Sequence, residues 1–274
     1  MRAIVPWLLL ILLVGCVHAT RAVQPRSGAE LAQTQATPSA APTPAYTDIG
    51  GVAAAPYIDE LTQLQVFWPP GGLFEPKKPV LRREFARWLF HADIAIWGMY
   101  PGTFIHPASP DAVVYFSDVP QQDPDFTAIQ GLHQAGVVLG KGKRFNPNRV
   151  ITREQALAIA AYVDCGGLDP AFAGNAAKAY AELPWRDKRK VGRQYVAAIA
   201  SCMRADDAAS VQNRLDTAER TFGNVTMLDP RRPLTRAQAA AMIWRIGQQK
   251  PDLNDFPPRT AEDALASSPA SATP

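Results

Sequence analysis

Residues 116–156 read FSDVPQQDPDFTAIQGLHQAGVVLGKGKRFNPNRVITREQA, and the signals in this stretch recur twice more along the chain of 274 residues. An isoleucine precedes an arginine by 24 residues in the first two copies (58→82, 129→153) and by 37 residues in the third (199→236). A unit repeated at such spacing predicts copies that share one core and present equivalent surfaces, which favours binding over catalysis. In each copy a proline lies six residues before that arginine: Pro76 and Arg82, Pro147 and Arg153, Pro230 and Arg236.

Each copy predicts a helix, a loop and a second helix. In the middle copy Phe126, Ile129 and Leu132 fall on one helical face at three-residue steps. Gly136 follows and ends the helix, because glycine lets the backbone turn. The Phe-Asn-Pro sequence at residues 145–147 then leads into the second helix.

The second helices carry start signals. Residues 152–155 and 235–238 each read as a capping box, in which a threonine hydroxyl caps a free amide and the third helical residue reaches back. The first copy has Leu81 in place of the hydroxyl and keeps Glu84. We expect its cap to be weaker by about 1 kcal/mol.

Arginine occupies the first helical position of the second helix in all three copies. A cation at a helix N-terminus opposes the helix dipole by about 0.3–1 kcal/mol, so we expect each arginine to have a partner. One alternative is an acidic residue of the same or a neighbouring copy. The other is an anionic ligand resting on the helix end, where free amides favour anions. The acidic candidates are Asp48, Asp118 and Asp187.

The repeated pattern resembles that of the S-layer homology domain family, which runs Phe-x-Asp-Val, an Ile-x-x-Leu helix, a glycine loop, Phe-x-Pro and Thr-Arg-Ala-Glu. The resemblance implies a mainly α fold, in which three helix-loop-helix repeats form a pseudo-threefold spindle with grooves between adjacent repeats. The third repeat contains 13 extra residues (37 − 24). We expect repeat 1 at residues 46–92, a connection at 93–114, repeat 2 at 115–163 and repeat 3 at 180–247.

The resemblance also implies a function. Family members bind anionic or pyruvylated polysaccharide that is attached to peptidoglycan, without a cofactor. The residues that this implies as glycan-binding are Arg82, Arg153, Arg236, Asp48, Asp118 and Asp187. Many such repeats carry a tryptophan five residues before the first helical isoleucine, but here those positions are Ala53, Pro124 and Gln194. The stacking surface that a tryptophan offers to a sugar is therefore missing.

The two ends of the chain predict export and anchoring. Residues 4–14 form an apolar run that is shorter than the roughly 20 residues a spanning helix needs. The run ends in Leu-Val-Gly-Cys, which resembles the bacterial lipobox. We therefore expect residues 1–15 to be a signal peptide and Cys16 to carry the lipid, and the alternative is an ordinary signal peptide cut near Ala19. The residue directly after this cysteine is Val17 rather than an aspartate. By resemblance to bacterial lipoproteins, this favours attachment of the protein to the outer membrane, where it would face the periplasm. Residues 16–45 and 248–274 predict a disordered linker and tail.

Composition narrows the classes of partner. Loss of Arg2 with the signal peptide leaves 27 basic and 25 acidic side chains, a net charge of +2, which is too weak to indicate nucleic acid. The sequence has no His-Glu-x-x-His and no Gly-x-Ser-x-Gly, and its four histidines lack metal-ligand spacing. We predict no catalytic residues, no metal and no cofactor. Cys165 and Cys202 predict either a disulfide or two buried thiols, since exported proteins permit both.

Two functions remain after these exclusions. The first is a lipid-anchored tether whose repeats bind peptidoglycan-linked polysaccharide and so join membrane to cell wall. The second is a protein-interaction module that binds another envelope protein without any glycan. A basic cluster at residues 186–190, with Arg193, is expected to be a solvated helix start.

Overall fold

The computed structural model describes residues 46–67, 71–97, 105–137, 142–165, 170–172, 174–203, 218–244 and 246. All of the described residues belong to one compact unit, residues 43–274. The predicted signal peptide, Cys16 with the linker to residue 45, and the tail from residue 248 lie outside the described residues. The described part is helical, and its only β pairing consists of isolated backbone bridges.

The described helices form three helix-loop-helix units. The first unit contains α1 (Ala55–Gln63) and α2 (Arg82–Trp97), and the second contains α3 (Phe126–Gln134) and α4 (Arg153–Cys165). The third contains α6 (Arg193–Met203) and α8 (Arg236–Ile243). The predicted mainly α fold is confirmed. Three short elements precede α6: η1 (Pro170–Phe172), α5 (Ala176–Glu182) and η2 (Lys188–Lys190).

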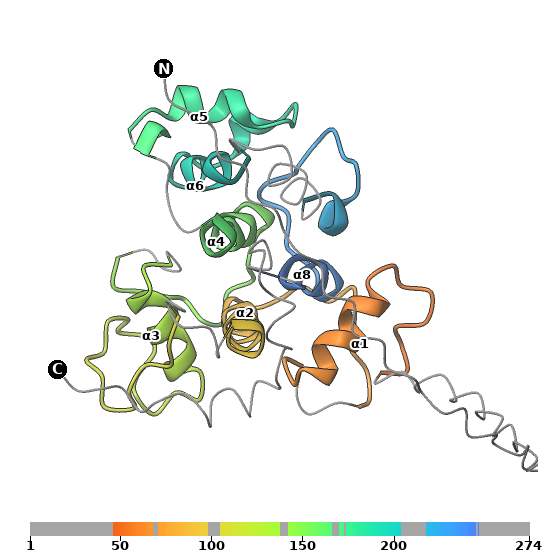
Figure 1. Cartoon of the computed structure of the whole chain (residues 1–274), viewed down its shortest axis with the longest axis vertical. Helices are drawn as coiled ribbons and strands as arrows, with labels where there is room; N and C mark the ends of the chain where they lie inside the picture. The colour runs from red at the N-terminus through yellow and green to blue at the C-terminus, as the bar shows by residue number, and fades with distance from the viewer. Residues whose placement is uncertain are drawn as a thin grey trace, which may run out of the picture. The chain divides into compact units, whose positions relative to one another are not determined.

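Helix packing takes place between units. The first helix of each unit packs on the second helix of another unit: α1 on α8, α3 on α2, and α6 on α4. Helix α8 also contacts α2 and α4. In Figure 1 the second helices α2, α4 and α8 are seen nearly end on at the centre. The first helices α1, α3 and α6 lie farther from the centre, each beside the second helix on which it packs. Because α1 of the first unit packs on α8 of the third, the succession of units closes on itself.

A ring of backbone hydrogen bonds joins the units just before their second helices. The amide of Val80 donates to the carbonyl of Leu234 at 2.9 Å, Leu234 donates to Ile151 at 3.0 Å, and Ile151 donates to Val80 at 3.0 Å. All three side chains are at most 1% exposed. Each residue of the ring donates once and accepts once, so the three units are related in the expected pseudo-threefold manner.

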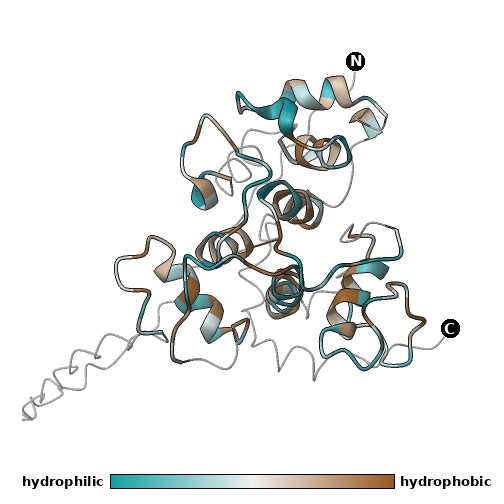
Figure 2. Cartoon of the chain, turned by 180° about the vertical axis from the view of Figure 1, so that it is seen from behind, coloured by the Kyte–Doolittle hydropathy of each residue, from teal (hydrophilic) through white to brown (hydrophobic). Residues whose placement is uncertain are grey.

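The hydrophobic core is continuous through the units. The first residue of each Phe/Leu-x-Pro motif, namely Phe74, Phe145 or Leu228, is fully buried in one cluster with Phe85 and Leu157. Burial of a side chain of this size contributes about 1.5–3 kcal/mol. Figure 2 shows hydrophobic residues along the central helices and hydrophilic residues along much of the loops.

The helix caps follow the sequence in two cases of three. Thr235 and Gln238 form the complete capping box at α8. At α2, where the hydroxyl is absent, Glu84 accepts a hydrogen bond from the amide of Leu81 at 2.8 Å. At α4 the amide of Thr152 donates to the Gln155 side chain at 3.2 Å, but Oγ1 of Thr152 makes no hydrogen bond to any described residue. The box predicted at α4 is therefore only half formed.

The connection between the first two units begins later than predicted from the sequence. Helix α2 continues through residues 93–97, which the sequence assigned to the connection. Further along, the backbone amide of Ala108 donates to the carbonyl of Thr127 at 3.2 Å, so this part of the connection lies against α3. The extra residues of the third unit fall mainly within 204–217, outside the described residues.

Candidate functional site

The N-termini of the three second helices are already occupied. The first two amides of α2 donate to carbonyls of the second unit, from Arg82 to Arg149 at 2.8 Å and from Arg83 to Pro147 at 3.0 Å. The same pair of bonds joins α4 to Arg232 and Pro230, and α8 to Lys78 and Pro76, at 2.9–3.0 Å. These amides need no ligand, because the next unit in the ring supplies their acceptors. An anion therefore has no free amide at the first two positions of these helices.

Each predicted aspartate clamps the Phe/Leu-x-Pro loop of its own unit. Asp48 accepts from the amides of Phe74 and Glu75 at 2.7 and 2.8 Å. Asp118 accepts from Phe145 and Asn146 at 2.8 Å each, and Asp187 accepts from Leu228 and Asp229 at 2.9 and 3.0 Å. Both carboxylate oxygens are used every time. Charge-assisted bonds of this kind are stronger than neutral ones.

The clamp has a conformational cause. The middle residue of each loop, Glu75, Asn146 or Asp229, has a positive φ of 57°, 59° or 51°. A side chain tolerates this left-handed conformation only at a cost, which the two amide bonds to the aspartate offset. Burial raises the pKa of Asp118, but the amides of Phe145 and Asn146 lower it more, so the pKa lies below its ordinary value of 3.8.

Each predicted arginine reaches across to the loop of the next unit. Arg82 donates from Nε to the carbonyl of Phe145 at 2.8 Å and lies 4.9 Å from the centre of its ring. Arg153 donates to the carbonyl of Leu228 at 2.8 Å. Burial is the main cause that lowers the pKa of both guanidinium groups. These two arginines join the second helix of one unit to the loop that the next aspartate clamps.

The third arginine, Arg236, makes contacts that differ from those of Arg82 and Arg153. Its guanidinium pairs with Glu84 at 3.3 Å and lies 5.1 Å from the ring centre of Phe74 and 5.0 Å from that of Trp88. Stacking on aromatic rings is worth about 0.5–2 kcal/mol per contact. Nε of Arg236 and of Arg153 has no hydrogen-bond partner among the described residues, and both atoms are buried. The six predicted residues thus lie at three equivalent junctions, and their contact with a glycan stays a prediction.

A second ionic cluster joins α2 to α3. Arg83 pairs with Asp123 at 2.6 Å, and Arg87 pairs with Asp125, which is 1% exposed, at 3.0 Å. Burial, reinforced by Arg87 and opposed by Asp125, lowers the pKa of the nearby His91 to about 4. His91 is therefore neutral at pH 7, and this cluster serves the packing of two units.

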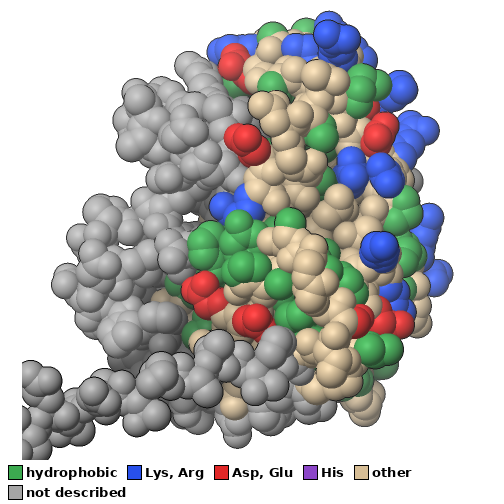
Figure 3. All heavy atoms as spheres, turned by 90° about the vertical axis from the view of Figure 1, so that its right-hand side faces the viewer, with side chains coloured by type: hydrophobic (Ala, Val, Ile, Leu, Met, Phe, Trp, Pro, Cys, Tyr) green, Lys and Arg blue, Asp and Glu red, His purple; other side chains and the backbone are tan. Residues whose placement is uncertain are grey.

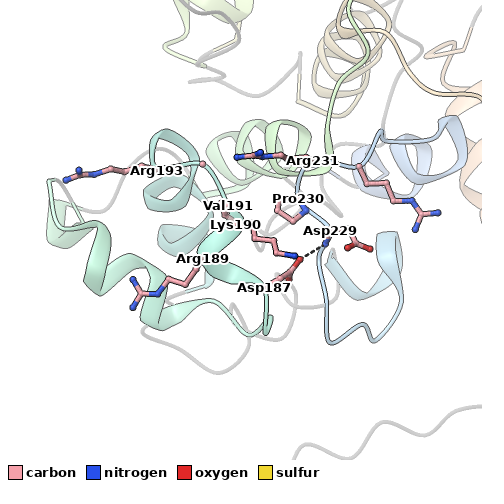
Figure 4. A pocket seen from close by; sticks show the side chains of 10 residues that line it. Asp187, Arg189, Lys190, Val191, Arg193, Asp229, Pro230 and Arg231 are labelled. Atoms are coloured by element: carbon pink, nitrogen blue, oxygen red, sulfur yellow. Dashed lines mark hydrogen bonds between the residues drawn. The ribbon is translucent and has the colours of Figure 1, made fainter.

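A basic cleft lies beside the third aspartate clamp. It encloses about 930 Å³ and is lined by residues from η2, the start of α6 and the third Leu-x-Pro loop. In Figure 4 Lys190 extends toward the Asp229 loop, while Arg189 and Arg193 extend to the left of the view. The sequence predicted a solvated helix start here and missed the cleft. The charged lining residues are Arg189, Lys190, Arg193, Arg231, Arg232, Asp187 and Asp229.

Charges on the surface are unevenly distributed. Figure 3 shows Lys and Arg side chains gathered along the upper and right-hand margin of one face, with Asp and Glu side chains spread singly across it. Within the described residues, no group of His, Cys, Asp and Glu side chains is arranged to hold a metal ion. The helices described here are too short or too polar to cross a membrane.

Each of the two cysteines predicted as possible disulfide partners lies at or near the C-terminus of a helix. Cys165 ends α4, and Cys202 is the penultimate residue of α6, the helix that packs on α4. Their side chains are outside the described part of the structure. The choice between a disulfide and two thiols therefore stays a prediction.

Comparison with known proteins gives one result that bears on function. No curated protein matches the chain. S-layer homology domains are binding and anchoring domains that generally attach proteins to the cell wall or envelope. Two segments of the chain, residues 45–86 and 115–157, match the model of the S-layer homology domain.

Proposed function

We propose that this chain is a lipid-anchored envelope protein that tethers a membrane to the cell wall. The assembly formed by its three units binds anionic polysaccharide linked to peptidoglycan, and lipid on Cys16 holds the outer membrane from the periplasmic side. The observation that carries the proposal is the closed ring of units, two of which contain the segments that match an envelope-attachment domain. The described residues also offer a charged cleft, which suits the binding of an anionic ligand.

The third unit is part of the proposal. It contains the same aspartate clamp, with Asp187 on the amides of Leu228 and Asp229. It also contains the arginine at the start of its second helix, and its Leu234 completes the backbone ring. We therefore treat residues 180–247 as a third S-layer homology domain. Extra residues before α8 give it a longer spacing between its motifs than the family pattern has.

Sedimentation with purified sacculi tests the tether. The chain from residue 17 onward, which keeps the whole compact unit 43–274, is mixed with sacculi before and after removal of their wall-linked anionic polysaccharide. We expect the protein to pellet only with the untreated sacculi, and added salt to weaken binding because exposed charges are screened. Folded protein that remains in the supernatant with untreated sacculi would overturn the proposal.

The contacts of the motif arginines favour a second candidate. Arg153 is 7% exposed and donates a hydrogen bond to a backbone carbonyl of the third unit. In this second candidate function the arginines only stabilise the fold, and the surface of the protein binds another envelope protein. In that case Arg153→Ala lowers the free energy of unfolding without a selective loss of sacculus binding. If Arg153 contacts glycan, the variant loses binding even at a temperature where circular dichroism shows it fully folded.

A further inference from the structure

The basic cleft of the third unit carries charge that the protein itself does not neutralise. Five basic and two acidic side chains line it, a net charge of +3 (5 − 2). The whole chain also has a net charge of +3 at pH 7. Charge equal to that of the entire protein is therefore concentrated around one cavity of about 930 Å³. Walls of low dielectric around such a cavity strengthen its attraction for counter-ions.

The acidic lining residues do not cancel this charge by direct contact. Asp187 is 5% exposed, and its two oxygens accept from the amides of Leu228 and Asp229. Among the described residues, no carboxylate lies within 4.0 Å of Lys190, Arg231 or Arg232. These cations line the same cleft, and none of them is paired with a carboxylate among the described residues. Burial and the nearby Arg232 lower the pKa of Arg153, while the charges of Asp229 and Asp187 raise it, so the charges around the cleft influence one another.

The other two units do not share this charge. Counted from the aspartate and the loop proline, the five basic positions become Gly50, Gly51, Ala54, Lys77 and Lys78 in the first unit. With Asp48 and Glu75 the local charge there is zero (2 − 2). In the second unit the five positions are Pro120, Gln121, Pro124, Asn148 and Arg149, and with Asp118 these positions again sum to zero (1 − 1). The basic residue nearest to that clamp is Arg144, which lies 3.8 Å from Asp118 and is paired with it. The excess of positive charge at these positions is thus a property of the third unit and not of the repeat.

We propose that the basic cleft is the anion-binding site of this protein and takes a linear glycan that carries several closely spaced negative groups. The inference rests on the proposed function and assigns it to one place. Lys190, Arg231 and Arg232 contact the anionic groups, while the motif arginines and aspartates hold the walls of the cleft. A cleft of this size accommodates more than one charged sugar, and three or more cations favour a polymer over a single anion.

Fluorescence anisotropy with defined oligomers tests the inference. Labelled oligogalacturonate supplies carboxylates, oligophosphate of equal charge supplies phosphates, and a neutral dextran oligomer serves as the blank. The cleft variant is Lys190→Gln, Arg231→Gln and Arg232→Gln in the chain from residue 17 onward. The matched control is Lys77→Gln, Lys78→Gln and Arg149→Gln, which removes the same net charge from exposed positions of the other two units.

We expect the cleft variant to bind oligogalacturonate about tenfold or more weakly, since each lost charge contact is worth up to about 1 kcal/mol. Its affinity should also depend less steeply on salt, because fewer counter-ions are released on binding. The control should keep wild-type affinity. Stronger binding of oligophosphate than of oligogalacturonate would assign phosphate as the preferred group on the glycan and still support the cleft.

Three results would overturn the inference. One is an equal loss of affinity in the control, which would show that only net charge matters. The second is wild-type protein that binds neither charged oligomer. The third is a cleft variant that keeps wild-type affinity. Sacculus sedimentation is run beside these assays: a wild type that pellets with sacculi but fails here leaves the tether intact and removes the cleft, whereas a wild type that stays in the supernatant removes the tether itself.

Discussion

Replacement of Asp118 by asparagine should destabilise the second unit through its loop. An asparagine side chain has one oxygen, so it can accept from only one of the two amides that the carboxylate now satisfies, those of Phe145 and Asn146. The variant loses one charged-acceptor hydrogen bond, worth about 1.5–3 kcal/mol, and weakens the other by about 0.5–1.5 kcal/mol. The side chain is only 18% exposed, so water replaces the lost acceptor poorly. We expect a total loss of about 2–4 kcal/mol in the free energy of unfolding.

Urea unfolding followed by far-UV circular dichroism at pH 7 measures this loss. In a domain of about 200 residues, a change of 1 kcal/mol in the free energy of unfolding shifts Tm by about 2–4 °C, so thermal scans should also resolve the loss. The control is Asp111→Asn, which removes an exposed carboxylate that accepts a hydrogen bond from the nearby Ser109 and should stay within about 0.5 kcal/mol of wild type. If Asp118→Asn costs no more than this control, the aspartate clamps do not stabilise the loops.

Acid provides an independent check on the same residue. The pKa of Asp118 is lowered in the folded protein, so folding favours the carboxylate over the acid. Its contribution is fully present above the unfolded pKa of about 3.9 and is lost as pH falls through the lower folded value. The stability gap between wild type and Asp118→Asn should therefore shrink below about pH 4. A gap that is unchanged at pH 3 would contradict the assigned cause.

Other variants probe the junctions between units. Gly131→Ala should cost about 1–3 kcal/mol by thermal unfolding, because its Cβ would collide with the carbonyl oxygen of His106, whereas Gly50→Ala has open space and serves as its control. The pKa of His91 is lowered to about 4, so wild type should lose stability between pH 6.5 and 4 as its unfolded state takes up a proton, and His91→Gln should lose less in urea titrations over that range. A chain cut after residue 173 lacks α8 and the carbonyls of Pro230 and Arg232, and it should show an unfolded circular dichroism spectrum although it contains both family matches.

Much of the local structure was visible in the sequence. The predicted arginines begin the second helices, since α2, α4 and α8 start at Arg82, Arg153 and Arg236. The isoleucine of each first helix lies in the core, namely Ile58, Ile129 and Ile199. Helix start signals and three-residue periodicity are local properties, and they survive because the packing here agrees with them.

The partners of the repeated residues could not be predicted in the same way. A repeat shows which residues are equivalent, but it does not show which copy is the neighbour in space. The sequence leaves two partners open for each arginine, an acidic side chain or an anionic ligand. The structure gives Arg82 and Arg153 a backbone carbonyl of the following unit, and gives Arg236 a glutamate of the first unit. These contacts depend on closure of the ring, which is a tertiary property.

The basic cleft was missed for a related reason. Its residues come from two stretches that lie about 40 positions apart (Arg193 to Arg232), and each stretch alone is an ordinary solvated segment. A comparison of charge at equivalent positions of the three copies would have found it, because only the third copy departs from zero. Differences between repeats carry this signal, whereas the resemblance between repeats conceals it.

This difference between the copies has a consequence for stoichiometry. Positions that recur in all three units are occupied by contacts within the protein. The aspartates bind the loops of their own units, whereas the arginines and the loop prolines contact a neighbouring unit. A ligand that relied on them would find three equivalent sites. A ligand that relies on the charge at the cleft positions finds one site, because these positions sum to +3 only in the third unit. Titration of a short charged oligomer by calorimetry should therefore saturate at one oligomer per chain, and saturation at three would return the binding role to the repeated motif.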